Sequence, residues 1–141
     1  MTCLPDVNVW IAMYTPGHVH HTIALRWFDS SSTSDLLFCR VTQMGFLRLL
    51  TNRHVMGENA LTPPRAWIAL DEILRSDRIF FAKEPPGLED VWRGIMQRQG
   101  LGPNAWTDAY LTAFAMQAGV TLVTFDARLA GRRNVSTHLL R

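Results

Sequence analysis

The sequence has few of the features that mark secreted, membrane-bound or disulfide-stabilised proteins. It contains 141 residues but only two cysteines, Cys3 and Cys39, which form no CxxC pair. Both lie among apolar residues, so we expect buried free thiols and not a disulfide. No apolar run approaches the roughly 20 residues that a membrane-spanning helix needs. The first residues also lack a basic segment followed by a long apolar stretch. We therefore expect a cytoplasmic protein with no membrane partner.

Lysine is almost absent from the basic residues. Thirteen of the 14 basic residues are arginine, and the one lysine is Lys83. Arginine binds phosphate through a bidentate fork, so this bias suits an RNA partner, although a genome that favours arginine codons produces the same bias. The net charge is only +2, and charge alone therefore does not establish nucleic-acid binding.

Several enzyme classes are excluded by motifs that are missing. No GxxxxGK[ST] loop is present, which excludes a P-loop enzyme. Phosphatases of the haloacid dehalogenase type also have an aspartate after their first strand, but they need a second acid two residues later, where this chain has Asn8. They and receiver-type signalling domains also need a late lysine, whereas Lys83 lies in mid-chain before a proline-rich break.

The residues that are present predict a compact α/β domain spanning residues 1–141. The hydrophobic fraction is 48% and the charged fraction is 18%, which suits one domain with a single core. Strand-like runs are expected at residues 3–8, 79–82, 120–124 and 135–138. Helix-like runs are expected at residues 21–29, 41–51, 64–75, 88–99 and 104–118, with Asn104 as an N-cap. This alternation predicts a parallel sheet with helices on both faces.

Three aspartates lie where such a fold would bring acids together. Asp6 and Asp126 each follow a strand-like run, and ligands of parallel sheets bind beyond the carboxyl ends of the strands. Asp108 lies in the first turns of a helix that precedes a strand, so only a specific packing would bring it to the same edge. Grouped carboxylates repel one another unless a cation neutralises them. We therefore predict a Mg²⁺ or Mn²⁺ site and phosphodiester chemistry.

Each of these acids also has a structural explanation. Asp6 could begin a turn, Asp108 could stabilise a helix N-terminus, and Asp126 could cap a short helix at residues 127–130. Asn8 and Thr124 flank the acids and could donate hydrogen bonds to them. A further basic group could contact RNA phosphates or form an ordinary solvated surface; its members are Arg40, Arg48 and Arg53, with His54 beside them.

The acid-bearing segments have a specific order and spacing along the chain. They are Leu4-Pro5-Asp6-Val7-Asn8-Val9-Trp10-Ile11-Ala12, Thr107-Asp108-Ala109-Tyr110-Leu111 and Val123-Thr124-Phe125-Asp126, with Phe46-Leu47-Arg48-Leu49-Leu50-Thr51-Asn52 between the first two. Together they resemble the PIN-domain family and, within it, the VapC-type toxins of toxin–antitoxin systems. The resemblance covers nearly the whole chain.

This resemblance implies a PIN-like three-layer α/β/α sandwich and a small metal-dependent endoribonuclease. It implies tRNA or rRNA as substrate, a VapB-type antitoxin that silences the activity, and a homodimer. Asp6, Asp108 and Asp126 would be both the catalytic and the metal-binding residues. Asp6 is expected to be a direct ligand of Mg²⁺ (or Mn²⁺), followed by Asp108, with Asp126 acting through water or as a base. Cleavage would leave a 5′-phosphate and a 3′-hydroxyl.

The chain departs from the family in one position. The family has a glutamate in the helix expected at residues 41–51, but this sequence has no acid between Asp35 and Glu58. The aligned residue is Gly45, and Gln43 lies two residues earlier as a possible neutral ligand or water contact. Loss of one negative charge weakens Mg²⁺ binding. An alternative function is therefore a PIN-like module that binds RNA or protein and has lost much of its catalysis.

Overall fold

Five parallel strands form one sheet in the order β3-β2-β1-β4-β5. The computed structural model describes residues 1–98, 100 and 102–141. The strands are β1 (Thr2–Pro5), β2 (Asp35–Phe38), β3 (Ile79–Phe81), β4 (Thr121–Thr124) and β5 (Thr137–Leu139). Because β1 is central and pairs with both β2 and β4, the first residues after β1 and β4 lie side by side at the carboxyl edge.

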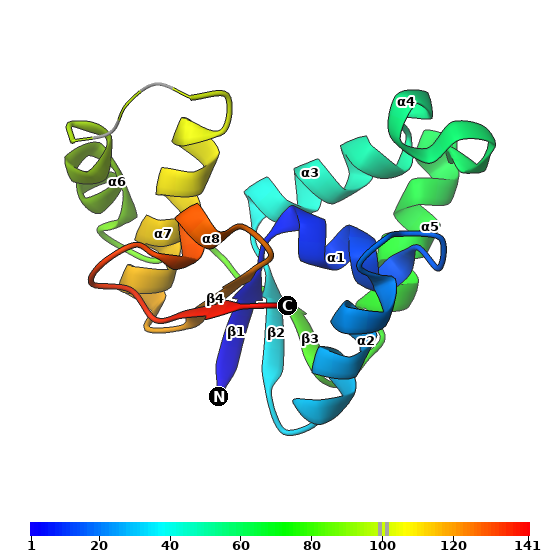
Figure 1. The fold of residues 1–141 in the computed structure, drawn as a ribbon, viewed down its shortest axis with the longest axis horizontal. Helices are drawn as coiled ribbons and strands as arrows, with labels where there is room; N and C mark the ends of the chain where they lie inside the picture. Colours follow the sequence, from blue (N-terminus) through cyan, green and yellow to red (C-terminus); the bar gives the residue numbers. More distant parts are fainter. Residues whose placement is uncertain (99, 101) are drawn as a thin grey trace.

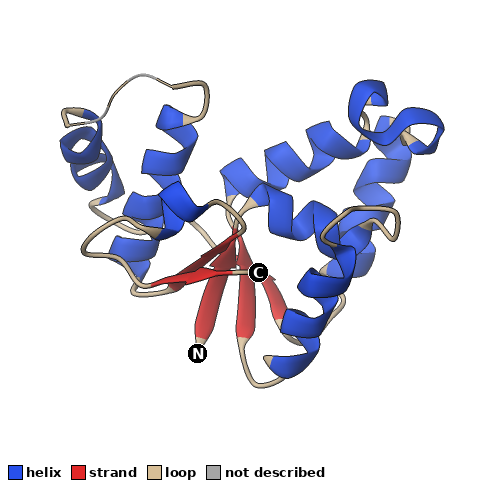
Figure 2. Ribbon diagram, in the orientation of Figure 1, coloured by secondary structure: helices blue, strands red, loops and turns tan. Residues whose placement is uncertain are grey.

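Helices cover both faces of this sheet (Figures 1 and 2). One face carries α1 (Val7–Tyr14), α2 (His21–Ser30), α3 (Arg40–Leu50) and α5 (Pro63–Ile73), and the short α4 (Arg53–Met56) and a 3₁₀ turn at Gly57–Asn59 connect the last two. The other face carries α6 (Leu88–Met96), α7 (Ala105–Ala118) and α8 (Ala127–Ala130). The molecule is therefore a three-layer α/β/α sandwich, as the resemblance implied.

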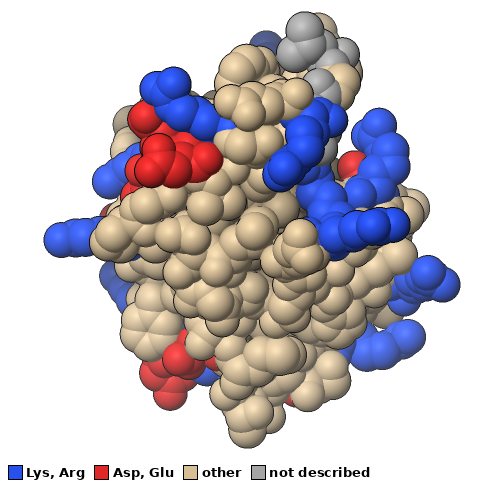
Figure 3. All heavy atoms as spheres, turned by 90° about the vertical axis from the view of Figure 1, so that its left-hand side faces the viewer, with Lys and Arg blue, Asp and Glu red and all other residues tan. Residues whose placement is uncertain are grey.

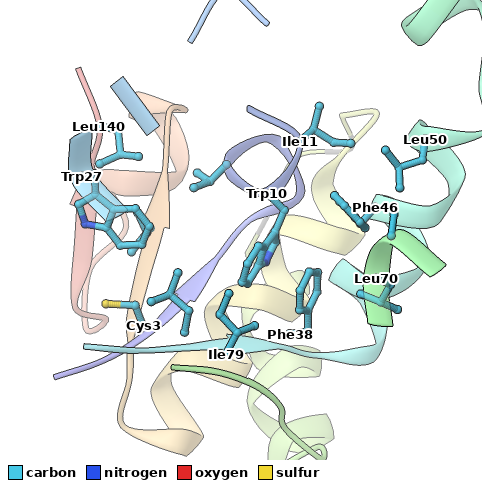
Figure 4. Packing of buried hydrophobic residues seen from close by; sticks show 14 of the residues in the cluster. Cys3, Trp10, Ile11, Trp27, Phe38, Phe46, Leu50, Leu70, Ile79 and Leu140 are labelled. Carbon is cyan, nitrogen blue, oxygen red and sulfur yellow. The ribbon is translucent and has the colours of Figure 1, made fainter. Parts of the chain in front are cut away.

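The alternation of side chains along each strand produces two separate cores. Leu36 and Phe38 point into the cluster beneath α1, α2, α3 and α5, whereas Leu37 between them packs against the cluster beneath α6 and α7. In the first cluster Trp10 stacks on Phe38, with ring centroids 3.8 Å apart and an interplanar angle of 12° (Figure 4). This contact fixes α1 against β2 and so fixes where the chain leaves β1.

The start of the chain differs from its prediction. The expected strand at residues 3–8 ends at Pro5, and an unpredicted helix, α1, follows at once. The Asp6 carboxylate caps this helix by accepting a hydrogen bond from the Val9 N–H at 3.1 Å. Asn8 consequently lies in a helix and not in a strand. Strand β2 was also not predicted, because it has only four residues and directly follows a polar loop.

The remaining elements lie close to their expected positions. The helix predicted at residues 88–99 ends at Met96, and residue 99 lies outside the described residues. Helix α7 begins after Asn104, but the Asn104 side chain makes no capping hydrogen bond. Gly119 ends α7 with a left-handed φ of 67°, a conformation that favours glycine. Both cysteines are buried and free, as expected.

Candidate active site

Asp6 lies at the centre of the carboxyl edge and is only 7% exposed. One carboxylate oxygen accepts from the Val9 N–H at 3.1 Å, and the other accepts from the hydroxyl of Thr124. Burial raises the pKa of Asp6 to about 6, although the hydrogen bonds from Thr124 and Val9 oppose this shift. The negative charge of Asp108 raises it further. Asp6 is thus held rigidly in a place where its charge is costly.

Asp126 follows β4, the strand next to β1. The Thr124 hydroxyl that donates to Asp6 also accepts from the Asp126 N–H at 2.9 Å, so one side chain joins the two acid-bearing segments. Asp126 caps α8 by accepting from the Arg128 N–H at 2.8 Å. Partial burial acts to raise the pKa of Asp126, but the hydrogen bonds and charge of Arg128 outweigh it, and the net pKa is lowered. Asp126 therefore stays ionised.

Asp108 lies at the same edge because the chain reverses direction between α7 and β4. Only Gly119 and Val120 connect α7 to β4, and the chain reverses direction there, so the first turn of α7 lies beyond the carboxyl ends of the strands. Burial raises the pKa of Asp108, and the charge of Asp126 raises it further, whereas Arg132 and Arg128 act to lower it. The sequence did not determine this packing. It allows Asp108 to interact electrostatically with Asp6 and with Asp126.

Charge coupling links Asp6 to Asp108 and Asp108 to Asp126. Among the residues that the structure describes, no group of three or more His, Cys, Asp or Glu side chains is placed to hold a metal ion. Mg²⁺ takes one or two direct carboxylates and retains several waters, so it does not need a closed protein cage. The buried Asp6, with its raised pKa and its charged neighbour Asp108, is the oxygen donor that such an ion would neutralise.

The other predicted polar residues have different positions. The Thr124 hydrogen bond to Asp6 is confirmed, and Thr124 is completely buried. The Asn8 side chain is exposed, and it is the backbone N–H of Asn8 that helps to stabilise the Asp6 charge. Gln43 is 9% exposed, and its side-chain oxygen accepts a hydrogen bond from Arg40.

Tight helix packing explains the missing glutamate. Helix α3 lies against α1, and a Cβ atom at Gly45 would lie 2.6 Å from Cγ2 of Val7, closer than side-chain atoms tolerate. No side chain fits at residue 45 unless Val7 moves. A side chain at residue 45 would therefore need a different packing of Val7, and this chain carries no negative charge there.

The arginines expected to contact RNA are all exposed. Arg40 and Arg48 lie on α3, and Arg53 begins α4. The guanidinium of Arg40 lies over the ring of Phe81, 4.6 Å from its centroid. The pocket that opens at Asp108 is lined instead by Arg128 and Arg132, which sequence reasoning missed. The sequence pattern that could have indicated them is a pair of arginines four residues apart, shortly after Asp126.

The chain is similar to several known proteins over nearly its full length. The family described as PIN domain matches residues 3–133. Ribonuclease VapC41 from Mycobacterium tuberculosis is 43% identical over 142 residues, covering 97% of both chains. Ribonuclease VapC39 from the same organism is 36% identical over 135 residues, covering 92% of both chains.

Solved structures show the same fold at lower identity. The VapC20 toxin of Mycobacterium tuberculosis, described as cleaving the Sarcin-Ricin loop, has a TM-score of 0.70 at 20% identity, covering 94% of this chain and 98% of that chain. VapBC2 from Rickettsia felis, bound to a DNA fragment from its promoter, has a TM-score of 0.69 at 11% identity over 100% of both chains. Across the parts of this chain that the structure describes, no helix is long and apolar enough to cross a membrane.

Proposed function

Because this chain belongs to the PIN-domain family, within its VapC group, we propose that it is an endoribonuclease toxin that hydrolyses RNA phosphodiester bonds with Mg²⁺ or Mn²⁺. The observation that supports the proposal best is the buried Asp6. Its carboxylate is held between α1 and Thr124 at the sheet edge, and its charge is coupled to that of Asp108. A buried carboxylate whose pKa is raised by burial and by a second acid favours a divalent ion as partner.

The chain's own residues have distinct roles in this reaction. Asp6 would hold the ion directly, because its two hydrogen bonds fix the carboxylate before the ion arrives. Asp108 would be the second ligand, and Asp126, which is more exposed, would act through water or orient the attacking water. The bound ion supplies a more acidic water and positive charge beside the phosphate. Hydrolysis by water, without participation of the RNA 2′-hydroxyl, would leave a 5′-phosphate and a 3′-hydroxyl.

The partners follow from the same proposal. We expect a VapB-type antitoxin to silence the enzyme, since similar folds are solved as VapBC complexes. We also expect a homodimer, an RNA substrate of the tRNA or rRNA class, and a cytoplasmic location where that RNA is found. Large apolar side chains remain exposed for such contacts, with Trp67 51%, Ile68 57% and Trp106 58% exposed.

RNA cleavage by the purified protein tests the proposal. Total RNA is incubated with Mg²⁺, with Mn²⁺ or with EDTA, and the new RNA ends are sequenced. We expect fragments that carry 5′-phosphates, that disappear with EDTA, and that disappear in Asp6→Asn and Asp108→Asn. The exposed Asp71 on α5 gives the matched control, and Asp71→Asn should cleave as the unchanged chain does.

A second function is favoured by Gly45, which removes one acid from the site. With three carboxylates and a neutral Gln43, the chain could bind RNA or an antitoxin with little catalysis. Intact RNA at every metal concentration and at high protein concentration would reject the nuclease and favour this binding module. RNA ends with 3′-phosphates would reject the proposed chemistry, because they require attack by the 2′-hydroxyl and not by water.

A further inference from the structure

A pocket of about 440 Å³ opens beside Asp108, between the start of α7 and the outer side of α8. Asp108, Arg128, Leu129 and Arg132 line it together with the residues that lead into α7. Its volume lies within the range of sites that hold small ligands. The pocket therefore joins an acid of the proposed metal site to two arginines.

Both arginines line the pocket from α8 and the residues just after it. Arg128 and Arg132 are four residues apart, and the turn of α8 continues through a hydrogen bond from the Arg132 N–H to the Leu129 carbonyl at 3.4 Å. Arg132 follows Gly131, the C-cap of α8, and it lines the same pocket as Arg128. Leu129 is 2% exposed and anchors α8 in the core. The Thr137 hydroxyl donates to the Ala130 carbonyl at 2.6 Å and holds the end of α8 against β5.

The Arg128 side chain is more exposed than the acid beside it, Asp126. Arg128 and Arg132 line the pocket together with Asp108, so two basic side chains and one acid face the same cavity. The Arg128 side chain is 87% exposed, although one of its nitrogens lies 3.5 Å from the Asp126 carboxylate. Figure 3 shows basic side chains on both sides of this part of the molecule, with acidic areas at the upper left and lower left and a small one among the basic side chains at the right. An approaching polyanion would meet arginine before it met the acids.

We propose that this pocket is a phosphate-binding subsite of the RNA-binding surface, in which Arg128 and Arg132 hold the backbone phosphate next to the one that is cleaved. The inference rests on the proposed function and adds a substrate contact to it. A guanidinium binds the non-bridging oxygens of a phosphate bidentately, which a neutral or acidic surface does not do. Because phosphates carry no base identity, the contact is independent of RNA sequence and positions the strand over the metal site.

The test measures RNA binding without cleavage. Arg128→Gln and Arg132→Gln are made in the Asp6→Asn background, and binding of single-stranded RNA oligonucleotides is measured in EDTA over a range of salt concentrations. Each substitution should lower the salt dependence of log K by about 0.7, the value for one phosphate contact on a single strand. The loss should be equal for oligonucleotides of different sequence. Arg75→Gln, at an exposed position of the segment after α5, is the control and should change neither quantity.

Two further variants separate binding from a role in folding. Arg128→Lys and Arg132→Lys keep the charge and should retain the salt dependence, with weaker binding because the bidentate fork is lost. Unchanged salt dependence in both glutamine variants would overturn the subsite. A loss confined to some RNA sequences would overturn it as well, because it would indicate base recognition. If the lysine variants lowered the salt dependence as much as the glutamine variants do, the cause would be misfolding, and this result would also count against the proposal.

RNA cleavage by Arg128→Gln and Arg132→Gln, made without Asp6→Asn, tests the subsite and the nuclease proposal separately. Metal-dependent cleavage with an unaltered KM in both glutamine variants would remove the subsite and leave the nuclease. A raised KM with a much smaller change in kcat supports the subsite. Absence of cleavage, together with the lowered salt dependence, would remove the nuclease and leave the pocket as an RNA-binding site.

Discussion

At Asp6, burial and charge oppose each other. Its carboxylate satisfies two hydrogen-bond donors that fix α1 and β4, yet its position in the sheet edge raises its pKa to about 6. A raised carboxyl pKa means that the folded state holds the proton more tightly than the unfolded chain does. The stability that this provides is fully present below the unfolded pKa and is lost as pH rises through the folded pKa.

Removal of this charge should stabilise the metal-free protein at neutral pH. The shift is roughly two pKa units, so Asp6→Asn should raise the free energy of unfolding by up to about 3 kcal/mol near pH 7.5. The gain should fall toward zero near about pH 4, where the unfolded carboxyl is also protonated. Urea unfolding in EDTA at both pH values measures it, with Asp71→Asn as the exposed control. A gain that is the same at both pH values would contradict the assigned cause.

Gly45 is required by the close approach of two helices and not by its backbone angles. Gly45→Ala places a Cβ atom 2.6 Å from Val7 Cγ2 and should destabilise the protein by about 1–3 kcal/mol, as overpacked cores do. Gly94→Ala on α6 meets no atom within 4 Å and should instead stabilise by about 0.5–1 kcal/mol through helix propensity. Thermal unfolding of both variants gives the comparison.

The same contact predicts a double-mutant coupling. Val7→Ala removes the two methyl groups that a side chain at residue 45 would meet, so Val7→Ala with Gly45→Ala should lose less stability than the sum of the two single variants. Strict additivity would show that α3 shifts away from α1 and that Val7 does not cause the strain.

At the scale of the elements, Arg78 connects the loop after α2 to the edge of the sheet. Its guanidinium donates to the carbonyls of Phe28, Ser31 and Ser34 at 2.6–3.3 Å and lies over the Phe28 ring at 4.2 Å. Its own carbonyl accepts from the Leu36 N–H at 2.7 Å, within the pairing of β2 and β3. One side chain therefore orders the polar loop that the sequence predicts and the short strand that it does not.

Replacement of the Arg78 guanidinium by a lysine ammonium should make the loop after α2 less ordered while the positive charge is kept. Arg78→Lys should cost about 2–3 kcal/mol, because three partly buried carbonyls lose their charged donor at once. Hydrogen exchange should increase first in residues 31–36. Arg75→Lys, three residues earlier and exposed, is the matched control and should change stability by less than about 0.5 kcal/mol. Uniformly increased exchange across all five strands would argue against a local role for Arg78.

At the scale of the whole molecule, the acid centre is an electrostatic cost that a divalent ion would offset. Asp6 lies between the two halves of the fold, and Asp108 comes from the α6–α7 side, so an ion held by both would tie the two sides together (Figure 1). Binding to the folded state alone stabilises it by RT ln(1 + [L]/Kd), about 2.7 kcal/mol at a hundredfold excess over Kd.

Metal addition should therefore raise the melting temperature by several degrees in the unchanged chain, and less in Asp108→Asn, where a ligand and a repulsive charge are both lost. Differential scanning fluorimetry with Mn²⁺, Mg²⁺ and EDTA measures the shifts. Asp71→Asn should respond as the unchanged chain does. Equal metal shifts in all three proteins would place the bound ion elsewhere on the surface.

The sequence by itself determined the elements with strong periodicity and clear ends. The parallel α/β class, the helices near residues 64–75 and 104–118, and the strand at residues 121–124 follow from side-chain pattern, proline and glycine. It also singled out the three aspartates and Thr124. It failed at α1, because a buried helix and a buried strand have the same continuous apolar pattern over so few residues.

Only the tertiary structure decided which distant groups meet. The reversal after α7 brings Asp108 to the edge where Asp6 and Asp126 lie, and the packing of α1 on α3 leaves no room for a side chain at Gly45. The turn of α8 then places Arg128 and Arg132 beside Asp108, a neighbourhood that no local pattern reports. Local periodicity reflects contacts within one element, whereas electrostatic coupling and steric exclusion arise between elements that only the completed sheet brings together.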